Sequence, residues 1–398
     1  MLNPDMVREA TRLTRAGQLV EATALLQRML QGGIAPGSES CSASQARLPR
    51  LDPPTIDATA DVVEEREAPQ IAPIRSAQGR RRSLPLDGMR DFSGLGLRSP
   101  ITRAPLSPSD IVPEGTRFIA GTFSNAAGSR TYKLFIPSRC QGQPLPLIVM
   151  LHGCTQSPDD FAAGTRMNLL AEEHNCFVAY PAQPSQANQA KCWNWFRKTD
   201  QQRGRGEPSL IAGMTRQIMD QYSVDRKRVY VGGLSAGAAA AAVMGATYND
   251  LYAAIGIHSG LPCGVATDLP SALVAMRQGG SDREVVSVDP SHVPTIVFHG
   301  DRDTTVHPNN GDQILEQSMG ALNARKKVVG GQVPGGRAYT TTIVSDARGR
   351  EVLEHWNVHG AGHAWSGGSP AGSYTDPRGP DATKEMLRFF LQHSLSKE

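Results

Sequence analysis

The sequence predicts an α/β domain over residues 111–398, built on a mostly parallel central sheet with helices on both faces. Short apolar runs alternate there with amphipathic stretches, which is the pattern of strand–helix–strand units. Residues 146–151 (PLIVML) are apolar throughout, as a strand buried on both faces must be. A strand-like run at 228–232 is separated by only five residues from an alanine-rich stretch at 238–242, which indicates a strand leading through a short turn into a helix.

The elements of this domain are expected in a regular order. The hairpin at its start is predicted from two alternating runs separated by a turn-prone Asn-Ala-Ala-Gly at 125–128. Strands are expected at 118–123, 131–136, 146–151, 177–180, 228–232, 253–257, 295–299 and 351–358. Helices are expected at 165–173, 210–221, 238–242 and 382–391.

The first 110 residues differ in composition from the rest. Apolar residues recur at helical spacing over residues 4–30, which predicts an N-terminal helical segment (1–31) of one helix or of two joined at Gly17. Its apolar stripe needs a partner surface, so we expect it to pack on its own domain or to self-associate. Residues 32–110 are rich in Pro, Ser, Ala and Arg with few aromatics, and this composition predicts a flexible linker.

Charge, hydropathy and cysteine content exclude several classes of binding partner and site. The net charge of +3 is spread along the chain, so no nucleic-acid or anionic-membrane partner is expected. No apolar run approaches the roughly 20 residues of a membrane span. The charged, periodic N-terminus lacks the apolar core of a secretory signal, so we expect a cytoplasmic protein. The six cysteines include no CxxC pair, which argues against a structural zinc site.

A candidate nucleophile lies in the segment Gly233-Leu234-Ser235-Ala236-Gly237. This G-x-S-x-G pattern follows a predicted strand and precedes a predicted helix, which is the context that gives the motif its meaning. The sharp turn raises the serine hydroxyl above the sheet, and small residues two positions away leave room for the backbone. Ser235 is therefore the predicted nucleophile.

A nucleophilic serine needs a base and an acid that orients the base. The loop after the predicted strand at 295–299 carries Asp301 and Asp303, and we favour Asp303 because Asp301 follows the strand so closely that it is expected to brace the turn. The candidate base is His363, which lies in a glycine-rich loop after the strand at 351–358. His299 and His307 are alternative bases, but their position beside the acid loop favours a bracing role.

A metal site is the competing interpretation of the same region. His355, His359 and His363 are spaced by four, which on a helix would align three ligands. Gly360 and Gly362 and the strand-like alternation of 351–358 argue against a helix there. We therefore expect no bound metal.

The oxyanion of the tetrahedral intermediate needs two donors. One backbone N–H is expected from Ala236, the residue after the nucleophile, and the other from a loop after an earlier strand. That loop is His152-Gly153-Cys154, so the amide of Cys154 is the candidate and His152 is expected to fix the loop. All of these segments follow strands, at the sheet edge where open α/β sheets bind ligands.

The region from about residue 118 to the C-terminus resembles the polyhydroxybutyrate (PHB) depolymerase-type esterases of the α/β-hydrolase superfamily. The matching segments are LHGCTQ at 151–156, FAAGTRMN at 161–168, CWNWF at 192–196, GLSAG at 233–237 and GHAWSGG at 362–368. The resemblance implies an α/β-hydrolase fold, no cofactor, and ester hydrolysis through a covalent acyl-enzyme. Trp193, Trp195 and Phe196, together with Trp365, are candidates for lining the substrate pocket, with core packing as the alternative.

The expected function is that of a serine esterase acting on poly- or oligo(3-hydroxybutyrate)-type hydroxyacyl esters. A feruloyl or acetyl-xylan esterase is the alternative from the same superfamily, and a non-catalytic interaction protein is the alternative from a different class. Many members are secreted, which makes an extracellular location the alternative to the cytoplasm. A disulfide between Cys154 and Cys192 stays open, although a reducing cytoplasm would disfavour it.

Overall fold

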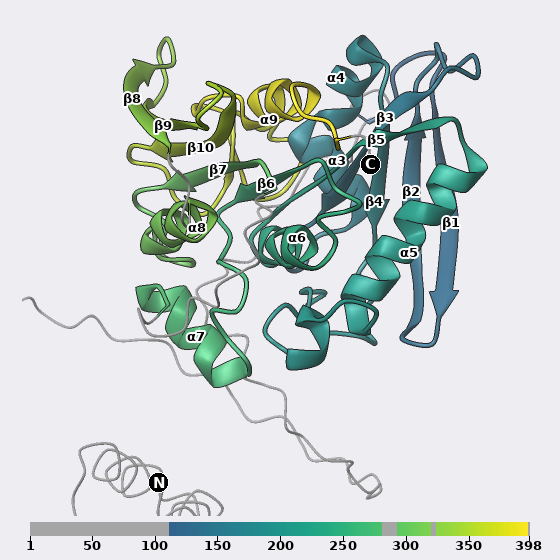
Figure 1. Cartoon of the computed structure of the whole chain (residues 1–398), viewed down its shortest axis with the longest axis horizontal. Helices are drawn as coiled ribbons and strands as arrows, with labels where there is room; N and C mark the ends of the chain where they lie inside the picture. The colour runs from purple at the N-terminus through teal and green to yellow at the C-terminus, as the bar shows by residue number, and fades with distance from the viewer. Residues whose placement is uncertain (1–110, 281–292, 320–323, 397–398) are drawn as a thin grey trace, which may run out of the picture. The chain divides into compact units, whose positions relative to one another are not determined.

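A computed structural model describes residues 111–280, 293–319 and 324–396. The expected N-terminal helical segment and the linker (1–110) lie outside the described residues. Within these, the chain forms a sheet in the order β1-β2-β4-β3-β5-β6-β7-β10-β9-β8 (Figure 1). The predicted α/β-hydrolase fold is thereby confirmed.

The six central strands, in the spatial order β4-β3-β5-β6-β7-β10, pair in parallel. The two strands at each edge pair antiparallel with each other and with the neighbouring central strand. The parallel strands are β4 (Phe177–Pro181), β3 (Leu145–Leu151), β5 (Val224–Leu234), β6 (Ala254–His258), β7 (Thr295–Gly300) and β10 (Glu351–Val358). The edge strands are β1 (Arg117–Asn125) and β2 (Gly128–Ile136) on one side and β9 (Ala338–Ser345) and β8 (Arg325–Gln332) on the other.

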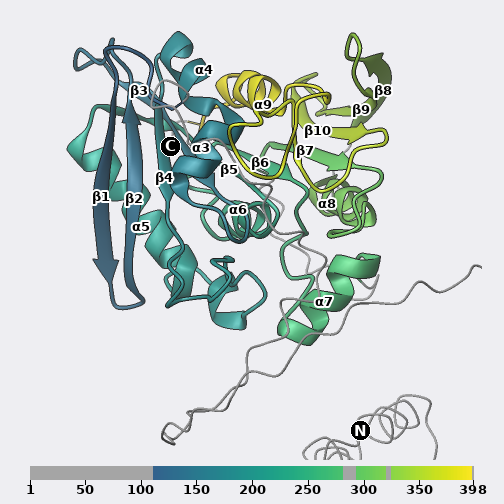
Figure 2. The same cartoon turned by 180° about the vertical axis from the view of Figure 1, so that it is seen from behind.

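Helices cover both faces of the sheet because successive side chains of each buried strand point in opposite directions. In β3, Leu147 and Val149 belong to the core beneath α5 (Gly206–Gln221) and α6 (Ala236–Thr247). The alternate residues Ile148 and Met150 pack on the other side with α3 (Pro158–Thr165), α4 (Met167–His174) and α9 (Ala382–Leu391). Figures 1 and 2 show these two layers from opposite sides.

Some predicted elements differ from the structure. The helix expected at 165–173 corresponds to α4 (Met167–His174), which begins two residues later than predicted because Arg166 adopts a left-handed conformation with φ of 54°. The preceding helix α3 (Pro158–Thr165) was not predicted. The predicted hairpin and the helix at 382–391 are confirmed as β1–β2 and α9 (Ala382–Leu391).

The sequence interpretation missed several elements. They are the edge strands β8 and β9, the helices α7 (Leu269–Gln278) and α8 (Asn309–Met319), and the short pair β11 (Trp365–Ser366) and β12 (Thr375–Asp376). In β8 the side chains alternate neither in polarity nor in burial, so the usual strand signal is absent. Among the described residues, no helix is both long enough and apolar enough to cross a membrane.

Candidate active site

Ser235 lies at the turn between β5 and α6, in a backbone conformation that non-glycine residues rarely adopt (φ 57°, ψ −121°). Its N–H donates to the carbonyl of His258 at 2.9 Å, which holds the turn against β6. The flanking glycines are required sterically, because a Cβ on Gly233 or Gly237 would overlap the carbonyl oxygen of Leu151. The strain and the two glycines together lift the serine side chain off the end of the sheet.

His363 and Asp303 form a buried pair. The distance from Nδ1 of His363 to Oδ2 of Asp303 is 2.7 Å, and the Asp303 side chain is fully buried. The other oxygen of Asp303 accepts the backbone N–H groups of Thr305 and Val306 at 2.9 and 2.8 Å. Burial alone would raise the pKa of Asp303, but the imidazole of His363 and these hydrogen bonds lower it below its usual value. The carboxylate is therefore ionised and orients the imidazole.

Asp301 has a different partner. Its Oδ1 accepts the N–H of Gly360 at 2.7 Å, and its Oδ2 lies 3.1 Å from Nδ1 of His359. Asp301 thus braces the turn that leads from β10 toward His363. The geometry supports the choice of Asp303 over Asp301 as the residue that contacts the candidate base.

The remaining histidines of this region do not converge on one point. Nδ1 of His355 lies 3.6 Å from Asp312, and Nε2 of His359 lies 2.9 Å from the hydroxyl of Thr340. His355 lies on β10 and His359 in the turn after it, so the helical alignment required for a metal site does not form. In the described part of the chain, no three His, Cys, Asp or Glu side chains are placed to hold a metal ion.

The two alternative bases flank the acid loop, His299 near the end of β7 and His307 after the loop. His299 is buried, with Nε2 2.9 Å from the carbonyl of Val306 and 3.6 Å from Asp303. His307 accepts the N–H of Asn309 through Nδ1 at 3.3 Å. Neither lines the pocket that contains Ser235 and His363.

The loop after β3 has a fixed geometry. Nε2 of His152 accepts the N–H of Gln183 at 3.1 Å, and Nδ1 lies 2.8 Å from the carbonyl of Gly153. Burial lowers the pKa of His152 to about 4, so the ring is neutral at neutral pH. Because Nε2 accepts, Nδ1 must carry the proton and donate it to that carbonyl.

This hydrogen bond sets the direction of the next amide. In a trans peptide the C=O of Gly153 and the N–H of Cys154 point in opposite directions. Pinning the carbonyl on His152 therefore turns the N–H of Cys154 to the other side of the peptide. Gly153 and Cys154 line the same pocket as Ser235 and Ala236, as an oxyanion site at Cys154 and Ala236 requires.

A disulfide joins Cys154 to Cys192, with a sulfur–sulfur distance of 2.02 Å. The sequence left this bond open, because the expected cytoplasmic location disfavours disulfides; its partners lie 38 residues apart in the chain. It ties the candidate oxyanion loop to the segment that carries Trp195 and Phe196. Both half-cystines line the pocket.

A buried carboxylate that the sequence interpretation missed supports the same region. Glu207, 6% exposed, accepts the backbone N–H of Asn194 at 2.7 Å and a side-chain N–H of Gln183. Gln183 in turn donates its backbone N–H to His152. Glu207 thus connects α5 to both sides of the pocket wall, through partners that only the fold brings together.

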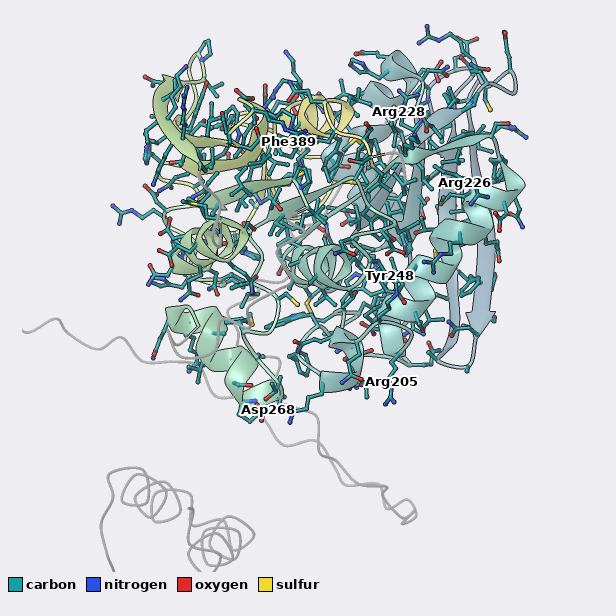
Figure 3. All side chains as sticks on the ribbon, in the orientation of Figure 1. Arg205, Arg226, Arg228, Tyr248, Asp268 and Phe389 are labelled. Carbon is teal, nitrogen blue, oxygen red and sulfur yellow. A yellow bond between two sulfur atoms is a disulfide. The ribbon has the colours of Figure 1, made fainter. Side chains whose placement is uncertain are left out.

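The pocket at Ser235 is mainly apolar. One wall is formed by Trp195 and Phe196, and another by Leu273 and Met276 of α7, together with Val306. Helix α7 begins after Asp268, whose carboxylate caps it by accepting the N–H of Ser271 (Figure 3). The polar side-chain groups in this lining are the hydroxyls of Ser235, Thr305 and Tyr374, the imidazole of His363 and the indole N–H of Trp195.

Two of the three tryptophans expected in the pocket do not line it. Trp193 is fully buried and donates its indole N–H to the carbonyl of His152 at 3.1 Å. Trp365 is also buried, stacks on His258 with ring centroids 4.9 Å apart, and donates to the hydroxyl of Thr383. For both residues the expectation was wrong, because their indoles fill the core behind the loops. Trp195 alone of the three contributes to the pocket lining.

His258 is a further site residue that the sequence did not reveal. Its carbonyl holds the N–H of Ser235, and its ring Nε2 accepts the N–H of Ser366 at 2.9 Å. Burial lowers the pKa of His258 well below its usual value, so the ring stays neutral. His258 therefore joins the nucleophile turn to the loop that carries His363. Its position inside an ordinary buried strand gave no signal.

Known proteins share this architecture and sequence. Residues 130–337, just over half of the chain, match the family model described as esterase PHB depolymerase. Poly(3-hydroxyalkanoate) depolymerase C of Paucimonas lemoignei is 34% identical over 228 residues, covering 55% of this chain and 54% of that protein. Acetylxylan esterase A of Aspergillus oryzae is 30% identical over 205 residues, covering 48% of this chain and 66% of that protein.

A solved structure, the acetyl xylan esterase from Aspergillus awamori, matches with a TM-score of 0.54 and 21% identity. The match covers 70% of this chain and 99% of that chain, and at this identity it supports the fold. The chain spans about half the length of the first curated relatives that it matches. On the family match, the chain belongs to the esterase PHB depolymerase family.

Proposed function

We propose that this chain is a serine esterase that hydrolyses carboxylic esters through an acyl-enzyme. The observation that carries the proposal is that Ser235, His363, Cys154 and Ala236 line one mainly apolar pocket, and that His363 is paired with the buried Asp303. No single motif supplies this combination. Membership of the esterase PHB depolymerase family supports the same activity.

In the proposed cycle, Nε2 of His363 takes the proton of Ser235 as the hydroxyl attacks the ester carbonyl. The amides of Cys154 and Ala236 hold the negative oxygen of the tetrahedral intermediate. His363 returns its proton to the leaving alcohol, and water then cleaves the acyl-enzyme by the same steps. Asp303 stays ionised and stabilises the imidazolium.

The test is hydrolysis of p-nitrophenyl butyrate by the Ser235→Ala variant. Removing the nucleophile is expected to lower kcat by about 10⁴- to 10⁶-fold. It should also abolish labelling by a fluorophosphonate probe. Ser209→Ala, on α5 and outside the pocket, serves as the matched control. Retention of more than a few per cent of the activity by Ser235→Ala would contradict the assignment.

For the substrate, we propose short or oligomeric hydroxyacyl esters of the 3-hydroxybutyrate type. The apolar walls at Trp195, Leu273 and Met276 suit a small alkyl chain. The relative named as a poly(3-hydroxyalkanoate) depolymerase supports this choice, and the relatives named as acetylxylan esterases support acetylated sugars as the second candidate. Comparing kcat/KM for a 3-hydroxybutyrate dimer and for an acetylated xylose would separate the two.

We also propose that the protein works in an oxidising compartment outside the cytoplasm. The disulfide between Cys154 and Cys192 favours this alternative, because such bonds persist mainly in oxidising surroundings. Mass spectrometry of the protein isolated from its native cells under thiol-blocking conditions tests it. Both thiols found free and alkylated would refute the proposal.

A further inference from the structure

Tyr374 lines the pocket but has no role in the proposed catalytic cycle. It lines the pocket together with Ser235 and His363 and is half-buried. Its backbone is left-handed, with φ of 53°, although tyrosine has no preference for that region. Strained backbone of this kind persists only where the surroundings hold it, and it gathers at functional sites.

Two sets of hydrogen bonds hold Tyr374 in this conformation. Its carbonyl accepts the N–H of Trp365 at 2.7 Å. The preceding Ser373 donates its N–H to Asp160 at 3.0 Å and accepts the side-chain amide of Gln156 at 3.1 Å. Gln156 also accepts the N–H of Gly153 at 2.9 Å, so the loop of Tyr374 and the candidate oxyanion loop are joined.

The phenol lies on the oxyanion side of the pocket. Its oxygen is 3.2 Å from the hydroxyl of Thr155, the residue directly after Cys154. Thr155 is itself left-handed, with φ of 66°, and is held by its N–H on the carbonyl of Ala190 at 2.7 Å. Two residues with left-handed backbone thus meet through their hydroxyls, with Tyr374 in the pocket lining and Thr155 on its exposed side.

This pair leaves one donor available to a ligand. A hydroxyl offers one proton and two lone pairs. When Thr155 donates to the phenol oxygen, the proton of the phenol is free to point into the pocket. The walls around it are mainly apolar, and the other side chains in the lining that can donate a hydrogen bond are few: Ser235, Thr305, His363 and Trp195.

We propose that Tyr374, oriented by Thr155, determines specificity by donating a hydrogen bond to a second oxygen of the substrate. The preferred substrates are then esters that carry a hydroxyl or acyloxy oxygen a few bonds from the reacting carbonyl, over plain alkyl esters of the same size. This inference rests on the proposed esterase function. It adds the residues that select among esters.

The experiment compares the Tyr374→Phe variant with the wild type on matched esters. The substrates are ethyl butyrate, ethyl 3-hydroxybutyrate with the extra oxygen on the acyl side, and 2-hydroxyethyl butyrate with it on the alcohol side. The readout is the selectivity ratio, kcat/KM for a hydroxylated ester divided by kcat/KM for ethyl butyrate. Loss of one neutral hydrogen bond should lower this ratio about three- to tenfold for at least one hydroxylated ester.

Three further variants separate recognition from a general effect on the fold. Thr155→Val keeps the shape but removes the orienting hydroxyl, and it should lower the ratio less, while Thr155→Ser should restore it. Tyr222→Phe is the matched control, because its ring packs on Phe177 outside the pocket. If Tyr374→Phe does not fold, the contrast between Thr155→Val and Thr155→Ser decides.

The outcomes are distinct. An unchanged ratio for both hydroxylated esters overturns the inference. An equal fall in kcat/KM for all three substrates also overturns it, because the phenol would then act on the reacting carbonyl or stabilise the fold rather than recognise a second oxygen. The hydroxylated ester that responds identifies the acyl or the alcohol side. Hydrolysis that survives Ser235→Ala refutes the proposed function instead, whatever Tyr374→Phe does.

Discussion

Replacing Asp303 with asparagine tests the site with almost no change of shape. One oxygen of Asp303 already accepts the N–H groups of Thr305 and Val306, and the other accepts Nδ1–H of His363 at 2.7 Å. An asparagine has one acceptor oxygen. If that oxygen stays on the two backbone donors, the new NH₂ group faces His363 and forces Nδ1 to accept.

The magnitude follows from the tautomer. With Nδ1 accepting, the ring proton lies on Nε2, the atom that must take the proton of Ser235. In the serine protease that serves as a general template, the same exchange lowers kcat about 10⁴-fold. Here the pair of residues 303 and 363 is buried, and the N–H groups of Thr305 and Val306 would fix the new amide. We therefore expect a similar fall in kcat, which corresponds to an increase of about 5 kcal/mol in activation free energy.

The assay is kcat for p-nitrophenyl butyrate, with circular dichroism to show that the fold is retained. Asp301→Asn is the matched control, since Asp301 contacts His359 and Gly360 rather than His363, and it should change kcat less than about threefold. A kcat for Asp303→Asn within tenfold of the wild type would refute the assignment of this acid. So would a larger effect at Asp301.

Three other outcomes are expected. His152→Leu removes the hydrogen bond that orients the amide of Cys154. We therefore expect kcat for p-nitrophenyl butyrate to fall about ten- to hundredfold, with KM changed less than about threefold. A change confined to KM would contradict this. Cys154→Ser with Cys192→Ser should lower the melting temperature in a thermal scan, because the link between two loops is lost; an unchanged melting temperature would count against a bond in the native protein. Burial lowers the pKa of His152 and of His355 from 6.5 to about 4, so the unfolded state takes up these protons first as pH falls. The free energy of unfolding in urea should then decrease by about 2 kcal/mol per histidine between pH 7 and pH 5, and a shallower slope is expected for His355→Gln, whereas a flat profile would refute the argument.

Local sequence patterns predicted many of the strands and helices of the fold. The strands β3 and β10 have bounds within a residue of the prediction, because the side chains that the sheet buries leave a direct mark in the sequence. The elbow at Ser235 was visible because its neighbours must be small. The pairing of His363 with Asp303 was expected from chain order, and the structure brings the two side chains to 2.7 Å.

What the sequence did not reveal depends on contacts between distant segments. Trp193 and Trp195 are alike in type and two residues apart, yet one supports His152 from the core and the other lines the pocket. The difference arises from the direction of a loop that the disulfide and Glu207 hold. Helix α7, which closes one wall, has a weak apolar pattern because both its inner and outer faces carry apolar residues, with Val274 56% exposed.

Backbone strain is a property of the pocket loops that residue types alone do not reveal in the sequence. Of the seven non-glycine residues with positive φ in the described part, Arg166 and Asn175 end helices, where this conformation is common. The other five, Thr155, Lys191, Ser235, Ser259 and Tyr374, all lie on the loops around the pocket. Each costs about 1 to 3 kcal/mol unless neighbouring contacts over-determine it. The surrounding hydrogen bonds therefore hold these loops in one arrangement, so that the fold itself sets the geometry of the pocket.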